Sequence, residues 1–102
     1  MSRSKRTVRL LRLAEEDLAD IVTFITADNP SAAASLARKM ERALERLAVH
    51  PYIGIVPADE ELVQLGYRYL ILDNYLVFYT VEHRTVLIHR IIHGARDYRS
   101  LL

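Results

Sequence analysis

The chain has 102 residues, of which 51% are hydrophobic and 26% charged, and its formal net charge is +1. This length suits a single domain, residues 1–102, whose core is large enough to fold without a metal or a disulfide. The absence of cysteine excludes disulfides, thiolate nucleophiles and Cys-ligated metal sites. No apolar run reaches the roughly 18 residues that span a bilayer, so we expect a soluble, cytoplasmic protein without membrane contact.

The small net charge conceals an uneven distribution along the chain. Residues 1–12 carry five bases and no acid, whereas residues 13–66 carry ten acids and four bases. Residues 67–102 are again slightly basic, with five bases and three acids. We expect residues 1–7 to form a mobile basic arm that meets nucleic acid or an acidic partner. A solubilising tail is the plain alternative.

The first half of the chain predicts a short strand followed by two helices. Apolar and basic residues alternate over residues 8–12, which favours a strand. From Ala14 the apolar residues recur at helical spacing, and this pattern assigns Ile25 to the core. Asn29 and Pro30 are typical of an N-cap and the first position of a second helix. The second helix is expected to end at His50. Its predicted core stripe is Ala33, Ala37, Met40, Leu44 and Leu47, broadened by Leu36 and Ala43.

The second half predicts a loop and then three strands. Residues 52–61 have no clear period and are expected to form a loop, with strand-like residues beginning at Leu62. Two β-branched and aromatic runs, residues 67–72 and 75–81, are separated only by Asp73 and Asn74, which predicts a tight hairpin. In this register Arg68 lies opposite Tyr79. A third strand is expected over residues 85–93, and Gly94 separates it from a short tail.

The predicted fold class is therefore α+β, in the order β-α-α-β-β-β, with an antiparallel sheet, a helical hairpin packed on one face and a short C-terminal tail. Both faces of the central hairpin are apolar, so we expect the second face to be covered by the tail or a partner. The register of the third strand stays open at this stage. Arg68 shares a face either with His89 and His93 or with Arg90.

Several polar residues near the strand ends could carry chemistry. A metal-free ribonuclease needs a base, an acid and cations near the phosphorane, and His, Tyr and Arg can fill these roles. The plain alternatives are a hydrogen bond from His93 to the backbone and a local ion pair between Arg96 and Asp97. A metal site is not predicted, because His89 and His93 on one strand lie about 13 Å apart. The candidates are Arg68, Tyr79, Arg90, His93, Arg96, Asp97 and Tyr98.

Several short motifs follow one another along the chain: Ala14-Glu15-Glu16-Asp17-Leu18-Ala19-Asp20-Ile21, Asp28-Asn29-Pro30, Leu47 through His50-Pro51 with Gly54, Gly66-Tyr67-Arg68, Asn74-Tyr75-Leu76-Val77-Phe78-Tyr79 and His93-Gly94-Ala95-Arg96-Asp97. Each motif is weak alone, but their succession is specific. From about Val8 onward this order resembles the RelE/ParE toxin superfamily. The resemblance implies the toxin of a type II toxin–antitoxin, or plasmid stabilisation, module. It also implies a cognate antitoxin as partner and a toxin–antitoxin heterotetramer as one assembly, with no cofactor.

The resemblance leaves two targets. RelE-like members cleave mRNA on the ribosome without metal, and in that branch Arg68, His93 and Tyr98 would be the catalytic residues. ParE-like members poison DNA gyrase, and Arg90, Arg96 and Arg99 would then contact the target. Leu76 stands where nuclease members often carry arginine, and the ending from His93 to Asp97 is more similar to ParE. We therefore expect a ParE-like gyrase inhibitor, with the mRNA endonuclease and a non-toxic interaction module as alternatives.

Overall fold

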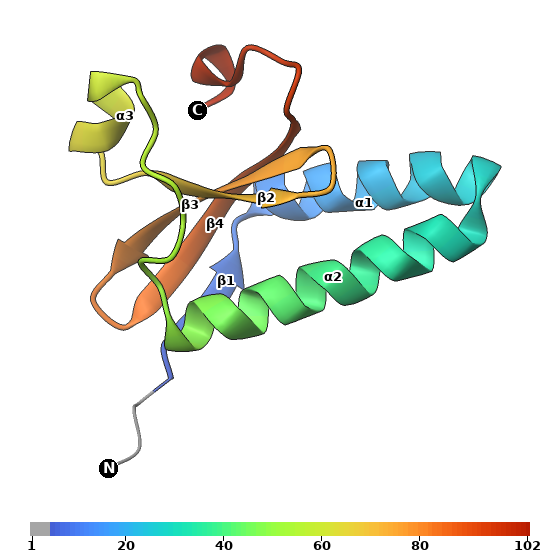
Figure 1. Cartoon of the computed structure of the whole chain (residues 1–102), viewed down its shortest axis with the longest axis horizontal. Helices are drawn as coiled ribbons and strands as arrows, with labels where there is room; N and C mark the ends of the chain where they lie inside the picture. Colours follow the sequence, from blue (N-terminus) through green and yellow to red (C-terminus); the bar gives the residue numbers. More distant parts are fainter. Residues whose placement is uncertain (1–4) are drawn as a thin grey trace.

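A computed structural model describes residues 5–102, which form one sheet with two long helices on one face (Figure 1). The elements in chain order are β1 (Thr7–Leu10), α1 (Arg12–Asp28), α2 (Pro30–Val49), α3 (Glu60–Gln64), β2 (Arg68–Leu72), β3 (Tyr75–Glu82), β4 (Thr85–His93) and the 3₁₀ helix η1 (Tyr98–Leu101). None of the described helices is long and apolar enough to cross a membrane. The predicted α+β class and element order are confirmed.

The sheet has the strand order β1-β4-β3-β2 and is mixed. β2, β3 and β4 are antiparallel neighbours, as predicted. β1 pairs with β4 in parallel, so the prediction of a wholly antiparallel sheet is wrong for β1. The helical hairpin explains the parallel pairing of β1 with β4. It returns the chain to the end of the sheet at which β1 begins, and the three later strands then alternate in direction, which leaves β4 parallel to β1. Of the predicted basic arm, residues 1–4 lie outside the described part, and Thr7 already belongs to β1.

The hairpin between β2 and β3 has the predicted register. Arg68 pairs with Tyr79 and Leu72 with Tyr75, and Asp73 adopts the positive φ of 55° that the two-residue turn requires. β3 and β4 are irregular at Phe78/Tyr79, where Phe78 pairs with Arg90 and Tyr79 with Ile88. His89 is the extra residue of this bulge.

The core lies between the helices and one face of the sheet. Leu47, Tyr79 and Ile88 are completely buried there. Asn29 caps α2 through its side chain, which accepts a hydrogen bond from the Ala32 N–H at 3.1 Å, and Pro30 follows at the first position, as predicted. The core stripe of α2 is Ala33, Leu36, Met40, Ala43 and Leu47.

Two residues of the predicted core stripes are placed differently by the structure. Ala37 is exposed, because the buried stripe passes through Leu36 and Ala43, which were predicted to broaden it, and not through Ala37. Ile25 is only partly buried and lies near the tip of the hairpin, outside the core cluster that Leu44 packs against. The tip of the hairpin projects beyond the sheet (Figure 1).

The short helix α3 was not predicted, since strand-like residues were expected from Leu62. The Asp59 side chain caps this helix by accepting a hydrogen bond from the Leu62 N–H at 3.1 Å, and Glu60 and Glu61 occupy its first turn. Gly66 follows with a φ of +83°, the left-handed conformation that ends helices. In residues 60–64 the helix-capping signals therefore decide the local structure, although the apolar residues had predicted a strand.

Candidate functional surface at the C-terminal segment

The face of the sheet away from the long helices carries an aromatic cluster. Phe78 is completely buried at its centre, with the Tyr69 ring 5.4 Å and the Tyr98 ring 4.9 Å from the Phe78 ring between centroids. Tyr98 belongs to η1, so the C-terminal segment itself covers this face, as the apolar character of both faces predicted. In Figure 1 the tail folds back over the sheet beside α3.

Arg90 fixes this segment to the body of the protein. Its guanidinium donates to both carboxylate oxygens of Asp17 at 2.7 and 2.9 Å and to the Leu101 carbonyl at 3.0 Å. Both side chains of the pair are less than one-fifth exposed, and Asp17 also accepts from the Ile91 N–H at 2.9 Å, beyond the end of β1. The hydrogen bond to Asp17 raises the pKa of Arg90. Arg90 is therefore engaged inside the fold.

The other two predicted target-binding arginines differ in their surroundings. Arg99 lies 3.3 Å from the Asp59 carboxylate and 3.9 Å from that of Asp97, while its side chain stays 66% exposed. The prediction of an ion pair between Arg96 and Asp97 is therefore wrong, because Asp97 pairs with Arg99, two residues further along the chain. No carboxylate of residues 5–102 lies within salt-bridge distance of the Arg96 guanidinium, and Arg96 is exposed.

The predicted catalytic residues do not come together. Arg68 on β2 lies opposite Tyr79 and His93 on β4 lies opposite Tyr75, four positions apart on the intervening β3. Their backbones are therefore separated by roughly 13 Å along the strands and by two strand spacings, roughly 10 Å, across the sheet. The Arg68 guanidinium donates to the carbonyls of Tyr52 and Gly54, both at 3.1 Å. The exposed His93 ring accepts a hydrogen bond from the Ala95 N–H at 3.2 Å.

Tyr98 lies on the opposite face of the sheet from Arg68 and His93, against Phe78. His93 and Arg68 share a face, but His89 and Arg90 belong to the other one, so neither predicted register of the third strand is fully correct. The bulge at His89 shifts the alternation by one residue, which the sequence pattern could not show.

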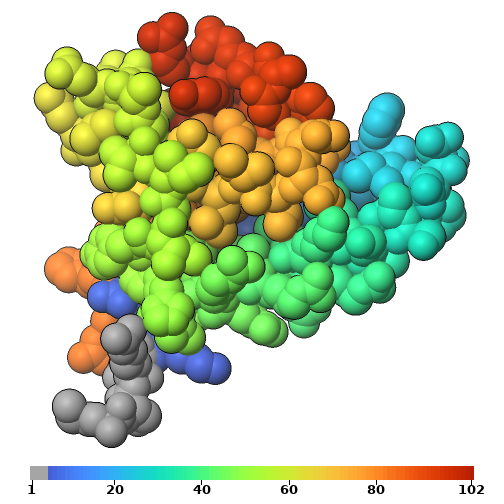
Figure 2. Space-filling view, viewed as in Figure 1, coloured from blue at the N-terminus to red at the C-terminus, as the bar shows by residue number. Residues whose placement is uncertain are grey.

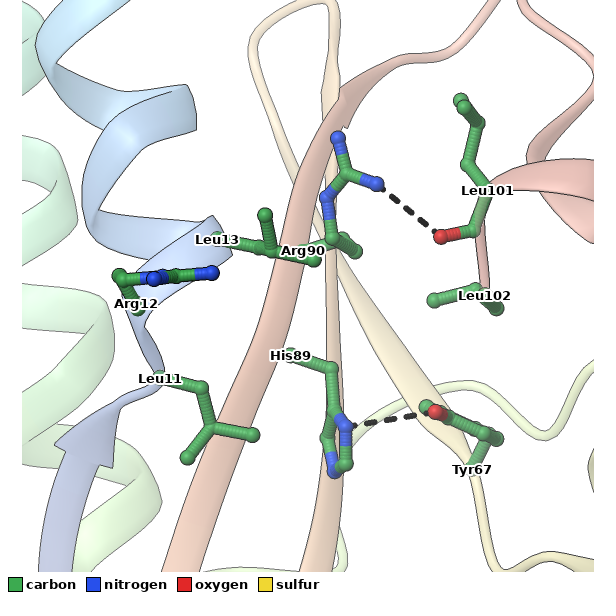
Figure 3. Close-up of a pocket in the computed structure, with 8 residues that line it drawn as sticks. All are labelled: Leu11, Arg12, Leu13, Tyr67, His89, Arg90, Leu101 and Leu102. Carbon is green, nitrogen blue, oxygen red and sulfur yellow. Dashed lines mark hydrogen bonds between the residues drawn. The ribbon is translucent and has the colours of Figure 1, made fainter.

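A pocket of about 310 Å³ lies where the tail meets β4 (Figure 3). The Tyr67 hydroxyl lies 3.3 Å from His89 Nδ1, and His89 Nε2 lies 2.8 Å from the Thr80 hydroxyl. Figure 3 shows Tyr67 and His89 facing each other and Arg90 turned toward Leu101. The lining residues are Leu11, Arg12, Leu13, Tyr67, His89, Arg90, Leu101 and Leu102.

Burial sets the protonation of this pocket. It lowers the pKa of His89, against a smaller opposing effect of Glu82, and it raises the pKa of Tyr67. Near neutral pH the pair is a neutral imidazole beside a protonated phenol, and one ring nitrogen accepts while the other donates. No role was predicted for His89 from the sequence, because it would lie too far from His93 to bind a metal with it. Within residues 5–102, no three potential metal-ligating side chains gather at one point.

The lowered pKa of His89 predicts a pH-dependent stability. Between this pKa and the ordinary value of about 6.5 the unfolded chain binds more protons, so the free energy of unfolding should fall as the pH drops from about 7 to about 5. Urea denaturation across this range measures the slope. His89→Gln should flatten it, because this change removes the imidazole whose pKa is lowered by burial. An unchanged slope in His89→Gln would assign the effect to another group.

Comparison with known proteins identifies the class to which this fold and surface belong. The family model described as the ParE toxin of the type II toxin–antitoxin system, parDE, matches residues 8–98. Toxin ParE1 of Caulobacter vibrioides is 34% identical over 95 residues, which cover 92% of this chain and 95% of that protein. The chain belongs to the ParE toxin family, and it is a toxin of the type II kind.

Two solved structures share the fold. The chromosomal ParDE system from P. aeruginosa matches with a TM-score of 0.71 and 18% identity, over 89% of this chain and 98% of that one. The toxin–antitoxin complex RelBE2 from Mycobacterium tuberculosis matches with a TM-score of 0.62 and 23% identity, over 93% and 98% of the two chains. The predicted RelE/ParE resemblance and its ParE-like branch are confirmed.

Proposed function

We propose that this toxin acts in the cytoplasm by binding and inhibiting DNA gyrase. Membership of the ParE family supports this target, and the separation of Arg68, His93 and Tyr98 is the structural observation that favours it over mRNA cleavage. A metal-free nuclease needs its proton donor, proton acceptor and cation within hydrogen-bond reach of one phosphate. These three residues lie at two ends and on two faces of the sheet.

The C-terminal segment offers the contact surface for this target. Arg96 is exposed and unengaged by any described carboxylate, and Arg99 is 66% exposed at the outer side of η1. Arg90 supports this surface from within, since it binds the Leu101 carbonyl. A surface of this kind gives affinity through several contacts and involves no proton transfer.

Binding to purified gyrase tests this assignment. Arg96→Ala and Arg99→Ala should each weaken retention of gyrase by a few-fold, and the double variant should weaken it further, because rim charges contribute small and separate amounts. Arg38→Ala, at an exposed position on α2, is the control and should bind as the native chain does. Unaltered gyrase binding in the double variant would show that the contact surface does not include Arg96 and Arg99.

We infer that a cognate antitoxin neutralises this toxin by covering the tip of the α1–α2 hairpin. Phe24 is 78% exposed there, beside an apolar pocket of about 770 Å³. Residues 13–66 carry the acidic excess of the chain, which complements a basic partner segment. Figure 2 shows the hairpin end projecting at the right of the molecule. The expected assembly is a heterotetramer of two toxins and two antitoxins. Light scattering would measure the molar mass of the complex and so test this stoichiometry.

Co-expression with a short open reading frame found to abut the toxin gene tests the antitoxin proposal. Phe24→Glu should keep the fold, because the ring is exposed, and should weaken antitoxin binding at least about tenfold by placing a charge in the apolar contact. Leu65→Glu, at another exposed apolar residue, is the matched control and should bind normally. Full rescue of growth and native affinity with Phe24→Glu would contradict the proposed surface.

A further inference from the structure

A cluster of cations surrounds the turn between β3 and β4, at the end of the molecule away from the hairpin tip. Lys5, Arg6, His83 and Arg84 line a hollow of about 220 Å³. Figure 2 shows the start of the described chain (blue) in contact with this turn (orange). The cluster therefore joins residues that lie nearly eighty positions apart in the sequence.

Backbone hydrogen bonds hold these cations in place. The Arg6 N–H donates to the Ala48 carbonyl at 2.8 Å, and the Thr7 N–H donates to the Arg84 carbonyl at 2.9 Å. Arg6 Nε donates to the carbonyl of His83 at 3.2 Å, and His83 has a φ of 50°, which turns the backbone sharply at this point. The charges are thus presented by an ordered edge of the sheet.

The charges of this cluster are not neutralised within the described chain. No carboxylate of residues 5–102 lies within salt-bridge distance of Lys5, Arg6 or Arg84. Of the other cations in the described part, Arg12, Lys39, Arg90 and Arg99 have a carboxylate partner. Further arginines, such as Arg38 and Arg42, have none, but they do not line this hollow. Like charges gathered without counterions repel one another, so an external anion would stabilise this arrangement.

An exposed aromatic ring extends the cluster toward β2. Tyr52 is 59% exposed, and its ring is in cation–π contact with two guanidinium groups. The guanidinium carbon of Arg6 lies 5.9 Å and that of Arg68 5.4 Å from the ring centroid. Cations interleaved with an exposed aromatic ring are typical of surfaces that follow a nucleic-acid backbone. An acidic protein segment would explain the cations but gives no role to the exposed ring.

We propose that Lys5, Arg6 and Arg84 bind the phosphate backbone of DNA. The hollow between them accepts a phosphate oxygen, and Tyr52 supports the adjoining sugar or base. This site is independent of the proposed gyrase contact, which lies on the C-terminal segment. It gives a role to Lys5 and Arg6, which neither the antitoxin surface nor the C-terminal surface uses.

Fluorescence anisotropy with labelled DNA of about 20 nucleotides, as duplex and as single strand, tests the site in the full-length chain. Each phosphate contact contributes about −0.9 to the slope of log affinity against log salt on duplex DNA, so Lys5→Gln with Arg84→Gln should reduce the slope by about 1.8. Arg38→Gln with Arg42→Gln removes the same charge from an exposed face of α2 and should leave the slope unchanged. Tyr52→Leu should weaken binding to the single strand more than to the duplex, because only unpaired bases stack on a ring.

Three results would overturn the proposal. They are the absence of DNA binding at about 50 mM salt, equal loss of binding in the α2 control pair, and displacement of DNA by polyglutamate as readily as by unlabelled DNA. The last result would assign the cluster to an acidic protein segment instead. Because gyrase is absent from this assay, failure here is distinguishable from failure of the proposed target.

Discussion

Replacing Leu47 by aspartate is expected to abolish folding. Leu47 is completely buried in the core cluster, where α2 packs against the sheet. The substitution leaves an uncompensated buried charge, at about 3–5 kcal/mol, and it also removes the packing of a large side chain, at about 2–5 kcal/mol. Together these costs equal or exceed much of the stability of a small domain, about 5–15 kcal/mol.

Ala37→Asp is the matched control for this substitution. It introduces the same charge into the same helix at an exposed position. Circular dichroism should show a cooperative thermal transition for Ala37→Asp and none for Leu47→Asp. Similar melting curves for the two variants would mean that the buried face of α2 is misassigned.

Gly54→Ala is expected to destabilise the protein strongly although it adds a single methyl group. A Cβ at this position would lie 2.7 and 2.9 Å from two ring carbons of Tyr79, a residue that is completely buried. The Tyr79 hydroxyl also accepts a hydrogen bond from the Gly54 N–H at 2.9 Å. Overpacking costs about 1–3 kcal/mol, and loss of this buried hydrogen bond costs about 1–3 kcal/mol more.

Urea denaturation measures this effect, with Gly94→Ala as the control. A Cβ at Gly94 would meet the Asn74 carbonyl oxygen at 3.4 Å, an ordinary contact, so this variant should resemble the native chain. In a Tyr79→Phe background the cost of Gly54→Ala should fall, because the hydroxyl nearest to the new methyl group is gone. Equal costs in both backgrounds would contradict the proposed clash.

The sequence predicted the elements whose signals are local. The N-cap at Asn29, the turn at Asp73 and the pairing of Arg68 with Tyr79 follow from residue types a few positions apart, and all three are confirmed. The parallel direction of β1 could not be predicted in this way. It depends on where the hairpin returns the chain, which is a property of the whole fold.

The candidate site was less predictable for a related reason. The bulge places His89 and Arg90 on the same face of the sheet. A strict alternation of side chains between the two faces would place these consecutive residues on opposite faces. The ion pair of Arg90 is made with Asp17, which lies 73 residues away in the sequence. The sequence pattern did not show this contact, and Arg90 was therefore predicted to bind the target together with Arg96 and Arg99. The roles of Arg96 and Arg99 in target binding stay a prediction.

We propose that this ParE-family toxin inhibits gyrase and does not cleave mRNA. Purified chain added to a gyrase supercoiling reaction, alongside primer extension on mRNA translated in its presence, tests this most directly. We expect loss of supercoiling with intact mRNA, and unchanged supercoiling inhibition in His93→Gln. Codon-phased cuts in the mRNA, with supercoiling unaffected, would contradict the account.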